Sequence, residues 1–234
     1  MKGKLDFLTI LALIVCAPST FAQIGGLRHP FDKEIDPTAD AISEFQKTGV
    51  IRAVSYPREQ TVKQLRLLLA PAGITVEEEQ FEDWRRFKNN FSVIVEWDAR
   101  PGAPDVTELK PNAPLSSVMT VKGVKKWEGS PGSLPALTLR QGDLFVAAVD
   151  AEAKLRWCNL HGDPLTMYYD YPDPKTGRLR GGMLQHSRTS LYLGFPADQK
   201  ITELKFFTHK WTAKGYVFEP LATVPVNEDA TPIR

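Results

Sequence analysis

Residues 143–171 read DLFVAAVDAEAKLRWCNLHGDPLTMYYDY, and this stretch decides the fold. It contains three short runs of apolar, β-branched and aromatic residues, at 143–150, 154–161 and 165–171, separated by turn-forming residues. Each run has the length of a β-strand and is too short for a typical helix. Consecutive strands with short polar connections are predicted to pair antiparallel.

Runs of the same type recur on both sides of this stretch. Short strands at this spacing, with no long helix among the later ones, are typical of an antiparallel β-sandwich. The further predicted strands cover residues 50–56, 91–98, 117–122, 136–140, 189–195, 201–211 and 216–226.

Helical patterns are confined to the N-terminal third of the chain. Pro37 after Asp36 is typical of a helix start, and Pro71 is typical of a helix end. The predicted helices cover residues 37–48, 61–70 and 77–89, with a strand as the alternative for the last. The predicted fold class is mainly β (α+β), with two or three short helices in the N-terminal third and an antiparallel β-sandwich in the C-terminal half.

The N-terminus has the order of a secretory signal peptide. Lys2 and Lys4 precede an apolar run at 8–17, and the small residues of 20–22 (TFA) offer a cleavage point. The apolar run is shorter than the ~20 residues that a spanning helix needs. We therefore expect export to the periplasm or the extracellular space, and no transmembrane segment after cleavage. Lipid attachment at Cys16 and a retained anchor are the alternatives.

The chain is expected to divide at changes of composition. The predicted parts are the signal peptide (1–22), an N-terminal α+β region (23–98), a Pro-rich loop (99–116), the β-sandwich (117–226) and a frayed tail (227–234). The alternative is one continuous domain over 35–226.

Charge and cysteine content exclude several classes of protein. The 29 basic and 28 acidic residues nearly balance. The sequence also has no stripe of basic residues that would indicate binding to nucleic acid. Cleavage of the signal peptide would leave Cys158 as the single cysteine, which excludes an internal disulfide. Stability must then come from a hydrophobic core.

Cys158 and His161 are weak candidates for a metal site. Residues three apart on a regular strand point to opposite faces, so the two side chains cannot share a metal ion unless a bulge intervenes. Further ligands would have to come from His186 or His209, which the sequence cannot place. We expect a small buried cysteine beside a strand-end histidine, with no metal and no cofactor.

No catalytic motif stands out in the sequence. The chain lacks G-x-S-x-G, H-E-x-x-H and the phosphate-binding G-x-x-x-x-G-K. Residues 170–177 (DYPDPKTG) do not have the spacing of a Ca²⁺ loop. Their last four residues, 174–177, are predicted to be a polar turn between two strands. No catalytic residue is therefore assigned.

The tyrosines after the Gly162–Pro164 bend are the best candidates for ligand binding. Alternation along a strand sends Tyr168 to one face and Tyr169 with Tyr171 to the other, so at least one ring is expected at the surface. Aromatic rings beside arginine and aspartate suit the recognition of sugars or peptides. The candidate ligand-binding residues are Tyr168, Tyr169, Tyr171, Asp173, Arg178 and Arg180. The alternative is that tyrosines on a sandwich face simply half-bury their rings.

Residues 142–207 contain a short series of structural motifs. These are A-V-D-A at 148–151, L-R at 155–156, D-P at 163–164, G-R-L-R-G at 177–181 and F-P at 195–196. In this series the segment resembles sandwich domains of bacterial exported proteins, such as the non-catalytic N-terminal domain of M64-type metallopeptidases, where the first motif is V-V-D-A. The resemblance implies a sandwich and an extracytoplasmic setting, and it transfers no catalytic residue.

The sequence favours an exported, non-catalytic binding or interaction module with a protein, peptide or glycan partner. A hydrolase that uses carboxylates or a histidine on the same scaffold is the first alternative. It requires two titratable groups with shifted pKa values in one cleft. A structural or assembly subunit of the cell envelope is the second alternative.

Overall fold

A computed structural model describes the chain over nine ranges. These are residues 37–48, 53–56, 58–77, 89–108, 114–128, 137–140, 142–197, 200–212 and 214–226. The chain divides into two compact units, residues 1–36 and 37–234, and every described residue belongs to the second. The predicted signal peptide, most of the predicted helix 77–89 and the tail after residue 226 lie outside the described residues.

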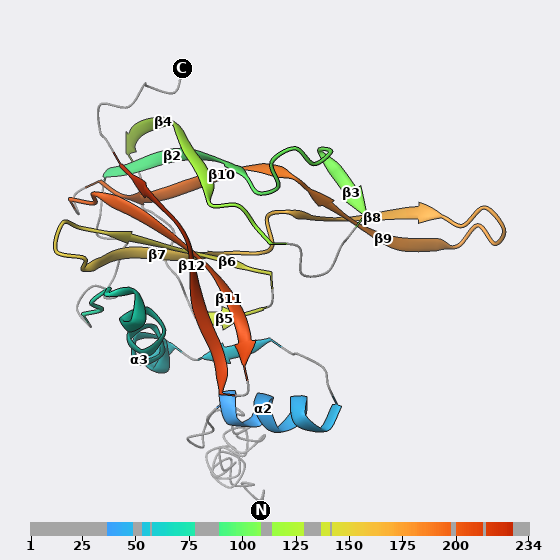
Figure 1. The fold of residues 1–234 in the computed structure, drawn as a ribbon, viewed down its shortest axis with the longest axis horizontal. Coiled ribbons are helices and arrows are strands. Elements are labelled where there is room, and N and C mark those ends of the chain that lie inside the picture. Colours follow the sequence, from blue (N-terminus) through green and yellow to red (C-terminus); the bar gives the residue numbers. More distant parts are fainter. Residues whose placement is uncertain are drawn as a thin grey trace, which may run out of the picture. The chain divides into compact units, whose positions relative to one another are not determined.

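Two of the predicted helices are confirmed (Figure 1). α2 covers Pro37–Thr48, and α3 covers Arg58–Leu69 and continues into the short 3₁₀ helix η2, Ala70–Ala72. α3 buries Leu65 and Leu69, which lie four residues apart on one face. Gly73 closes η2 with a positive φ of 70°, a conformation that favours glycine.

Two antiparallel sheets form separate layers, as the sequence predicts (Figure 1). One has the order β10-β2-β4 and the other the order β12-β11-β6-β7. The strands of the first are β2 (Asn89–Asp98), β4 (Val118–Glu128) and β10 (Arg188–Pro196). Those of the second are β6 (Leu144–Val149), β7 (Leu155–His161), β11 (Glu203–Thr212) and β12 (Gly215–Pro225).

The core lies on both faces of the second sheet. All six residues of β6 are buried, which explains its continuous apolar run. On one face Trp157 of β7 packs on Phe195 of β10, with ring centroids 6.2 Å apart. On the other face Phe145 packs on Phe207 and Phe218. The fold is therefore mainly β, with a sandwich-like arrangement of antiparallel sheets.

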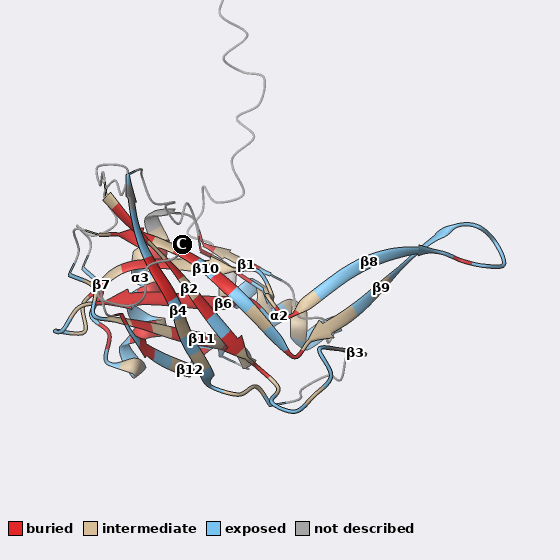
Figure 2. Cartoon of the chain, turned by 90° about the horizontal axis from the view of Figure 1, so that it is seen from above, coloured by how far each residue is buried: buried red, intermediate tan, exposed pale blue. Residues whose placement is uncertain are grey.

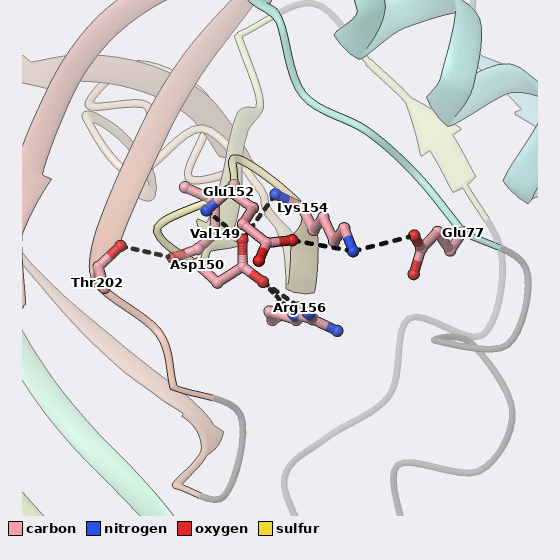
Figure 3. A network of polar contacts seen from close by, with 7 residues as sticks. All are labelled: Glu77, Val149, Asp150, Glu152, Lys154, Arg156 and Thr202. Atoms are coloured by element: carbon pink, nitrogen blue, oxygen red, sulfur yellow. Dashed lines mark hydrogen bonds and ion pairs between the residues drawn. The ribbon is translucent and has the colours of Figure 1, made fainter.

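A polar network closes the β6–β7 hairpin (Figure 3). Asp150 accepts hydrogen bonds from the backbone N–H groups of Glu152 and Lys154, both at 2.9 Å, and pairs with Arg156. Burial alone would raise the pKa of Asp150, but these bonds outweigh it and lower the pKa. Lys154 also pairs with Glu77, at 3.6 Å. The network fixes the turn at this end of the hairpin.

Two smaller sheets complete the described fold. β1 (Val54–Tyr56) pairs with β5 (Leu137–Leu139), and a second sheet has the order β3-β9-β8. Its strands are β3 (Val106–Glu108), β8 (Thr166–Pro172) and β9 (Leu179–His186). β3 lies within the stretch predicted as a Pro-rich loop, and β9 was not predicted. β9 reads LRGGMLQH, and its two central glycines have little preference for strands.

The β8–β9 hairpin, residues 166–186, extends away from the two large sheets and is called the arm (Figures 1 and 2). Most of its residues are exposed. The predicted polar turn over 174–177 is confirmed, because Pro172 ends β8 and Leu179 begins β9. Among the described residues, no helix has the length and apolarity that a membrane span requires.

Candidate functional site

An open cleft of about 580 Å³ lies at the root of the arm. It is assembled from segments far apart in the sequence: the two strands of the arm, both large sheets, and the loops that enter β6 and leave β7. The polar or aromatic side chains that decide its chemistry are Arg100, Asp143, Asp163, Tyr168, His209 and Glu219. Only Tyr168 among them was predicted as a site residue.

Two Gly-Asp dipeptides bring the carboxylates of Asp143 and Asp163 together. Gly142–Asp143 precedes β6 and Gly162–Asp163 follows β7, and the pairing of Leu144 with His161 places both dipeptides at one end of the hairpin. A Cβ atom on Gly142 would lie 2.9 Å from Oδ2 of Asp163. Gly142 also has a φ of +94°, so glycine is required there for both reasons.

Asp163 is held by hydrogen bonds at the start of β8. Its Oδ1 accepts the backbone N–H groups of Leu165, at 3.0 Å, and Thr166, at 3.2 Å. Its Oδ2 accepts the hydroxyl of Thr166 at 2.6 Å. This is the geometry of an Asx turn. Asp163 therefore positions the first residues of the arm.

Asp143 is buried and has an abnormal pKa. Burial raises the pKa of this carboxyl, and the charge of Asp163 raises it further. Hydrogen bonds with the backbone of Arg140 and Asp163, and the charge of Arg140, offset only part of this effect. Asp143 is thus biased toward its neutral, protonated form compared with an exposed aspartate.

His209 lies beside the cleft as a neutral imidazole. Its Nε2 bonds to the carbonyl oxygen of Arg140, which can only accept, so Nε2 carries the proton. Its Nδ1 is buried and has no hydrogen-bond partner among the described residues. Burial lowers the pKa of His209, and the ring packs edge-on against Tyr216 with centroids 5.1 Å apart. The enclosed Nδ1 leaves His209 poorly placed to exchange protons with a ligand.

The raised pKa of Asp143 predicts how its removal changes stability with pH. In the unfolded chain an aspartate has a pKa of about 3.9, and in the folded protein the pKa of Asp143 is higher. The protonated carboxyl therefore contributes stability at a pH below about 3.9, and this contribution is lost as the pH rises through the pKa of the folded protein. We expect Asp143→Asn to melt above the wild type at pH 7, and the difference to shrink toward about pH 4 in thermal unfolding followed by circular dichroism. A lower melting temperature for Asp143→Asn at pH 7 would contradict this assignment.

The structure places the three predicted tyrosines on two faces of the arm. All three rings are exposed. Tyr169 and Tyr171 stack on one face with centroids 5.7 Å apart, and Tyr169 lies over Gly182. Tyr168 is on the opposite face beside Met183 and lines the cleft. The predicted alternation is confirmed.

The predicted charged residues gather at the tip of the arm. Asp173 is buried, pairs with Arg180, and accepts the backbone N–H of Lys175 at 2.7 Å. Arg178 is exposed and accepts the backbone N–H of Asp173 through its carbonyl oxygen. Neither arginine lines the cleft at the root of the arm, whereas Tyr168 does. Arg180 is opposite Tyr171 in the pairing register and therefore shares that tyrosine's face of the arm.

Cys158 and His161 lie on opposite faces of β7, as predicted. Cys158 pairs with Ala147 and His161 with Leu144, an odd number of positions apart. Burial raises the pKa of the Cys158 thiol far above its usual range and lowers the pKa of His161. No group of three or more metal-ligating side chains occurs within the described parts of the chain.

Sequence reasoning missed Asp143, His209 and Glu219. One signal was available, because Gly-Asp occurs at both open ends of a predicted hairpin, at 142–143 and 162–163. His209 and Glu219 carried no local signal, since only the pairing of β11 and β12 brings them to the cleft.

No protein-family model, no curated protein and no solved structure matches this chain. The resemblance to exported sandwich domains therefore stays a prediction.

Proposed function

We propose that the protein is an exported binding module on a β-sandwich scaffold, and that its glycan or peptide ligand contacts the arm. One observation carries the proposal. Of the ten large hydrophobic side chains that are exposed among the described residues, six lie on the arm: Met167, Tyr168, Tyr169, Tyr171, Leu179 and Met183. Exposed apolar side chains concentrated on one element are typical of an interaction site.

The arm is ordered up to its tip, which favours binding. Asp173 accepts the N–H groups of Lys175 and Thr176, and Gly177 adopts a positive φ of 66° that the turn requires. The N–H of Gly177 donates to the Asp173 carbonyl at 2.8 Å. A preformed surface loses little conformational entropy when it binds, so more of the contact energy contributes to affinity.

The face that carries Tyr168 has the chemistry expected of a ligand surface. Apolar surface on this face comes from the flat ring of Tyr168 and the flexible side chains of Met183 and Leu179. Asp170 on the same face supplies a hydrogen-bond acceptor. This face continues into the cleft through Thr166 and Gln185. Aromatic rings beside carboxylates suit sugar rings with their hydroxyl groups, or extended peptides with their N–H groups.

Array binding with a matched pair of tyrosine variants tests the proposal. Tyr168 and Tyr192 are 74% and 73% exposed, but Tyr192 lies on β10, away from the arm. We expect the chain without its signal peptide to bind a subset of a glycan or peptide array. Tyr168→Ala should weaken that binding by about tenfold, as expected for an aromatic contact worth ~1–2 kcal/mol. Tyr192→Ala should leave binding unchanged. Equal binding by the two variants would remove Tyr168 from the ligand surface.

The cleft supports a hydrolase as a second candidate. Asp143 lines it together with the carboxylate of Asp163, and burial raises the pKa of Asp143. A carboxyl with a raised pKa can act as a general acid, with Asp143 in this role. Cleavage of an array ligand by the wild type but not by Asp143→Asn would favour the enzyme, and intact ligand after long incubation would favour the binding module.

A further inference from the structure

We propose that the cleft at the root of the arm binds the carboxylate of an acidic sugar, and that the guanidinium of Arg100 recognises it. The ligand class is a glycan that contains uronic acids. This inference rests on the proposed binding function of the arm, and it adds the class of sugar and the residue that selects it.

Arg100 lines the cleft and has no partner for its charge. Two arginines are half-buried among the residues whose side chains the structure describes, Arg100 and Arg156. Arg156 pairs with Asp150, whereas the side chain of Arg100 forms no hydrogen bond or ion pair with any described residue, and its Nε is buried. Removing part of a charged group from water without a counter-ion costs free energy, and an anionic ligand reduces that cost.

The backbone around Arg100 is fixed by hydrogen bonds. The N–H of Arg100 donates to the carbonyl of Ser187 at 2.9 Å, and the carbonyl of Arg100 accepts the N–H of Ala103 at 3.1 Å. One residue earlier, the carbonyl of Ala99 accepts the N–H of Ser116 at 2.9 Å. A binding group on a fixed backbone needs little ordering when the ligand arrives, so more of the contact energy contributes to affinity.

Gln185 is a second polar residue of the cleft whose side chain lacks a partner. It lies opposite Thr166 in the pairing of β8 with β9. Its Oε1 is buried, and its side-chain amide forms no hydrogen bond among the described residues. Buried polar groups without a hydrogen bond are rare in native proteins and require an explanation. One polar ligand in the cleft can satisfy both Gln185 and Arg100.

The carboxylates that line the cleft have partners other than Arg100. Asp163 accepts the hydrogen bonds that start β8, and the carboxylate of Glu219 lies 3.9 Å from Nζ of Lys210. Burial raises the pKa of Asp143, which favours its neutral form and reduces the negative charge of the cleft. The guanidinium of Arg100 therefore remains available to an anion of the ligand.

The same carboxylates favour a sugar over a peptide as the source of that anion. Asp163 and Glu219 repel a carboxylate, but they accept hydrogen bonds from hydroxyl groups. A uronic acid carries its carboxylate and several hydroxyl groups on one ring, whereas a peptide carboxylate has no hydroxyl group beside it. The exposed ring of Tyr168 also lines the cleft and offers a flat face to a sugar ring. The cleft volume of about 580 Å³ is in the range of ligand-binding sites.

Matched ligands test the inference on the wild-type protein. The probes are oligogalacturonate, oligoglucuronate and oligomannuronate, each compared with its methyl ester, which keeps the rings and hydroxyl groups and removes the charge. We expect at least one acid to bind in calorimetric titrations. Its ester should bind at least about tenfold more weakly, as for the loss of a hydrogen bond between charged groups. High salt should weaken binding of the acid and leave that of the ester unchanged.

Arg100→Gln tests the residue. It should weaken binding of the acid at least about tenfold and leave the weak binding of the ester unchanged, so the two changes are not additive. Arg100→Lys keeps the charge without the paired donors and should give an intermediate affinity. Arg188→Gln removes the same charge from an exposed arginine outside the cleft, and it should change the dissociation constant less than about threefold. Melting curves confirm that the variants fold.

Three results would overturn the inference. They are a wild type that binds none of the uronic-acid probes, an acid and an ester that bind equally well, and an Arg100→Gln variant that keeps the preference for the acid. Binding of acidic peptides through Arg100, without binding of any uronic acid, would overturn the assignment to a sugar.

The same titrations separate this inference from the proposed function. Binding of neutral glycans or of peptides that depends on Tyr168 would leave the proposed function intact and remove the uronic-acid class. Binding of the acid that needs Arg100 but not Tyr168 would keep the carboxylate site and remove the arm from the ligand surface.

Discussion

Trp157→Ala is expected to lower the free energy of unfolding by about 3–5 kcal/mol, the range for removing a large aromatic side chain from a packed core. Trp157 is 1% exposed and packs on Phe195, which belongs to the other large sheet. The substitution thus creates a cavity between the two layers of the sandwich. The neighbouring side chains come from sheet backbones fixed by their own hydrogen bonds, so the cavity can close only in part.

Denaturant unfolding monitored by fluorescence and circular dichroism gives the measurement. Tyr192→Ala is the control, because Tyr192 is on the outer face of β10 and Phe195 is on its buried face. We expect this control to change the free energy of unfolding by less than about 0.5 kcal/mol. A cost below about 1 kcal/mol for Trp157→Ala would show that the two sheets do not pack through this residue.

Removal of the arm is expected to abolish ligand binding with little effect on stability. Residues 168–183 would be replaced by Asn-Gly, so that Met167 and Leu184 flank a two-residue turn. The N–H of His186 donates to the carbonyl of Leu165, so the alternation of an antiparallel pair makes Met167 and Leu184 a hydrogen-bonded pair as well. Such a pair closes an Asn-Gly hairpin well. The replaced residues contribute no buried hydrophobic side chain. The free energy of unfolding should therefore change by less than about 1 kcal/mol.

The core of the fold could be predicted because its pattern is local. The strands at 143–150 and 154–161 are runs of apolar residues with turn residues between them, and the structure shows them as β6 and β7. β9 escaped prediction because Gly181 and Gly182 reduce its strand propensity. Gly182 has a structural reason to be there, since a Cβ atom would lie 2.5 Å from the ring of Tyr169.

The candidate site could be predicted only in part. Alternation along β8 gave the two faces of the tyrosines correctly, because it depends on one strand alone. The cleft depends on long-range pairing, which brings Asp143 and His209 to the root of the arm and cannot be inferred from local spacing. Which tyrosine lies nearest to Arg180 also depends on pairing, since the register of β8 and β9 places Arg180 opposite Tyr171 and not opposite Tyr168.

The central claim is that the arm carries the ligand surface of an independently stable sandwich. Its most direct test is to probe the same glycan and peptide arrays with the intact chain and with the chain in which Asn-Gly replaces residues 168–183, after matched melting curves confirm that both are folded. We predict that the intact chain binds a defined subset of ligands and that the shortened chain binds none of them. Undiminished binding by the shortened chain would contradict the claim and place the ligand surface elsewhere on the sandwich.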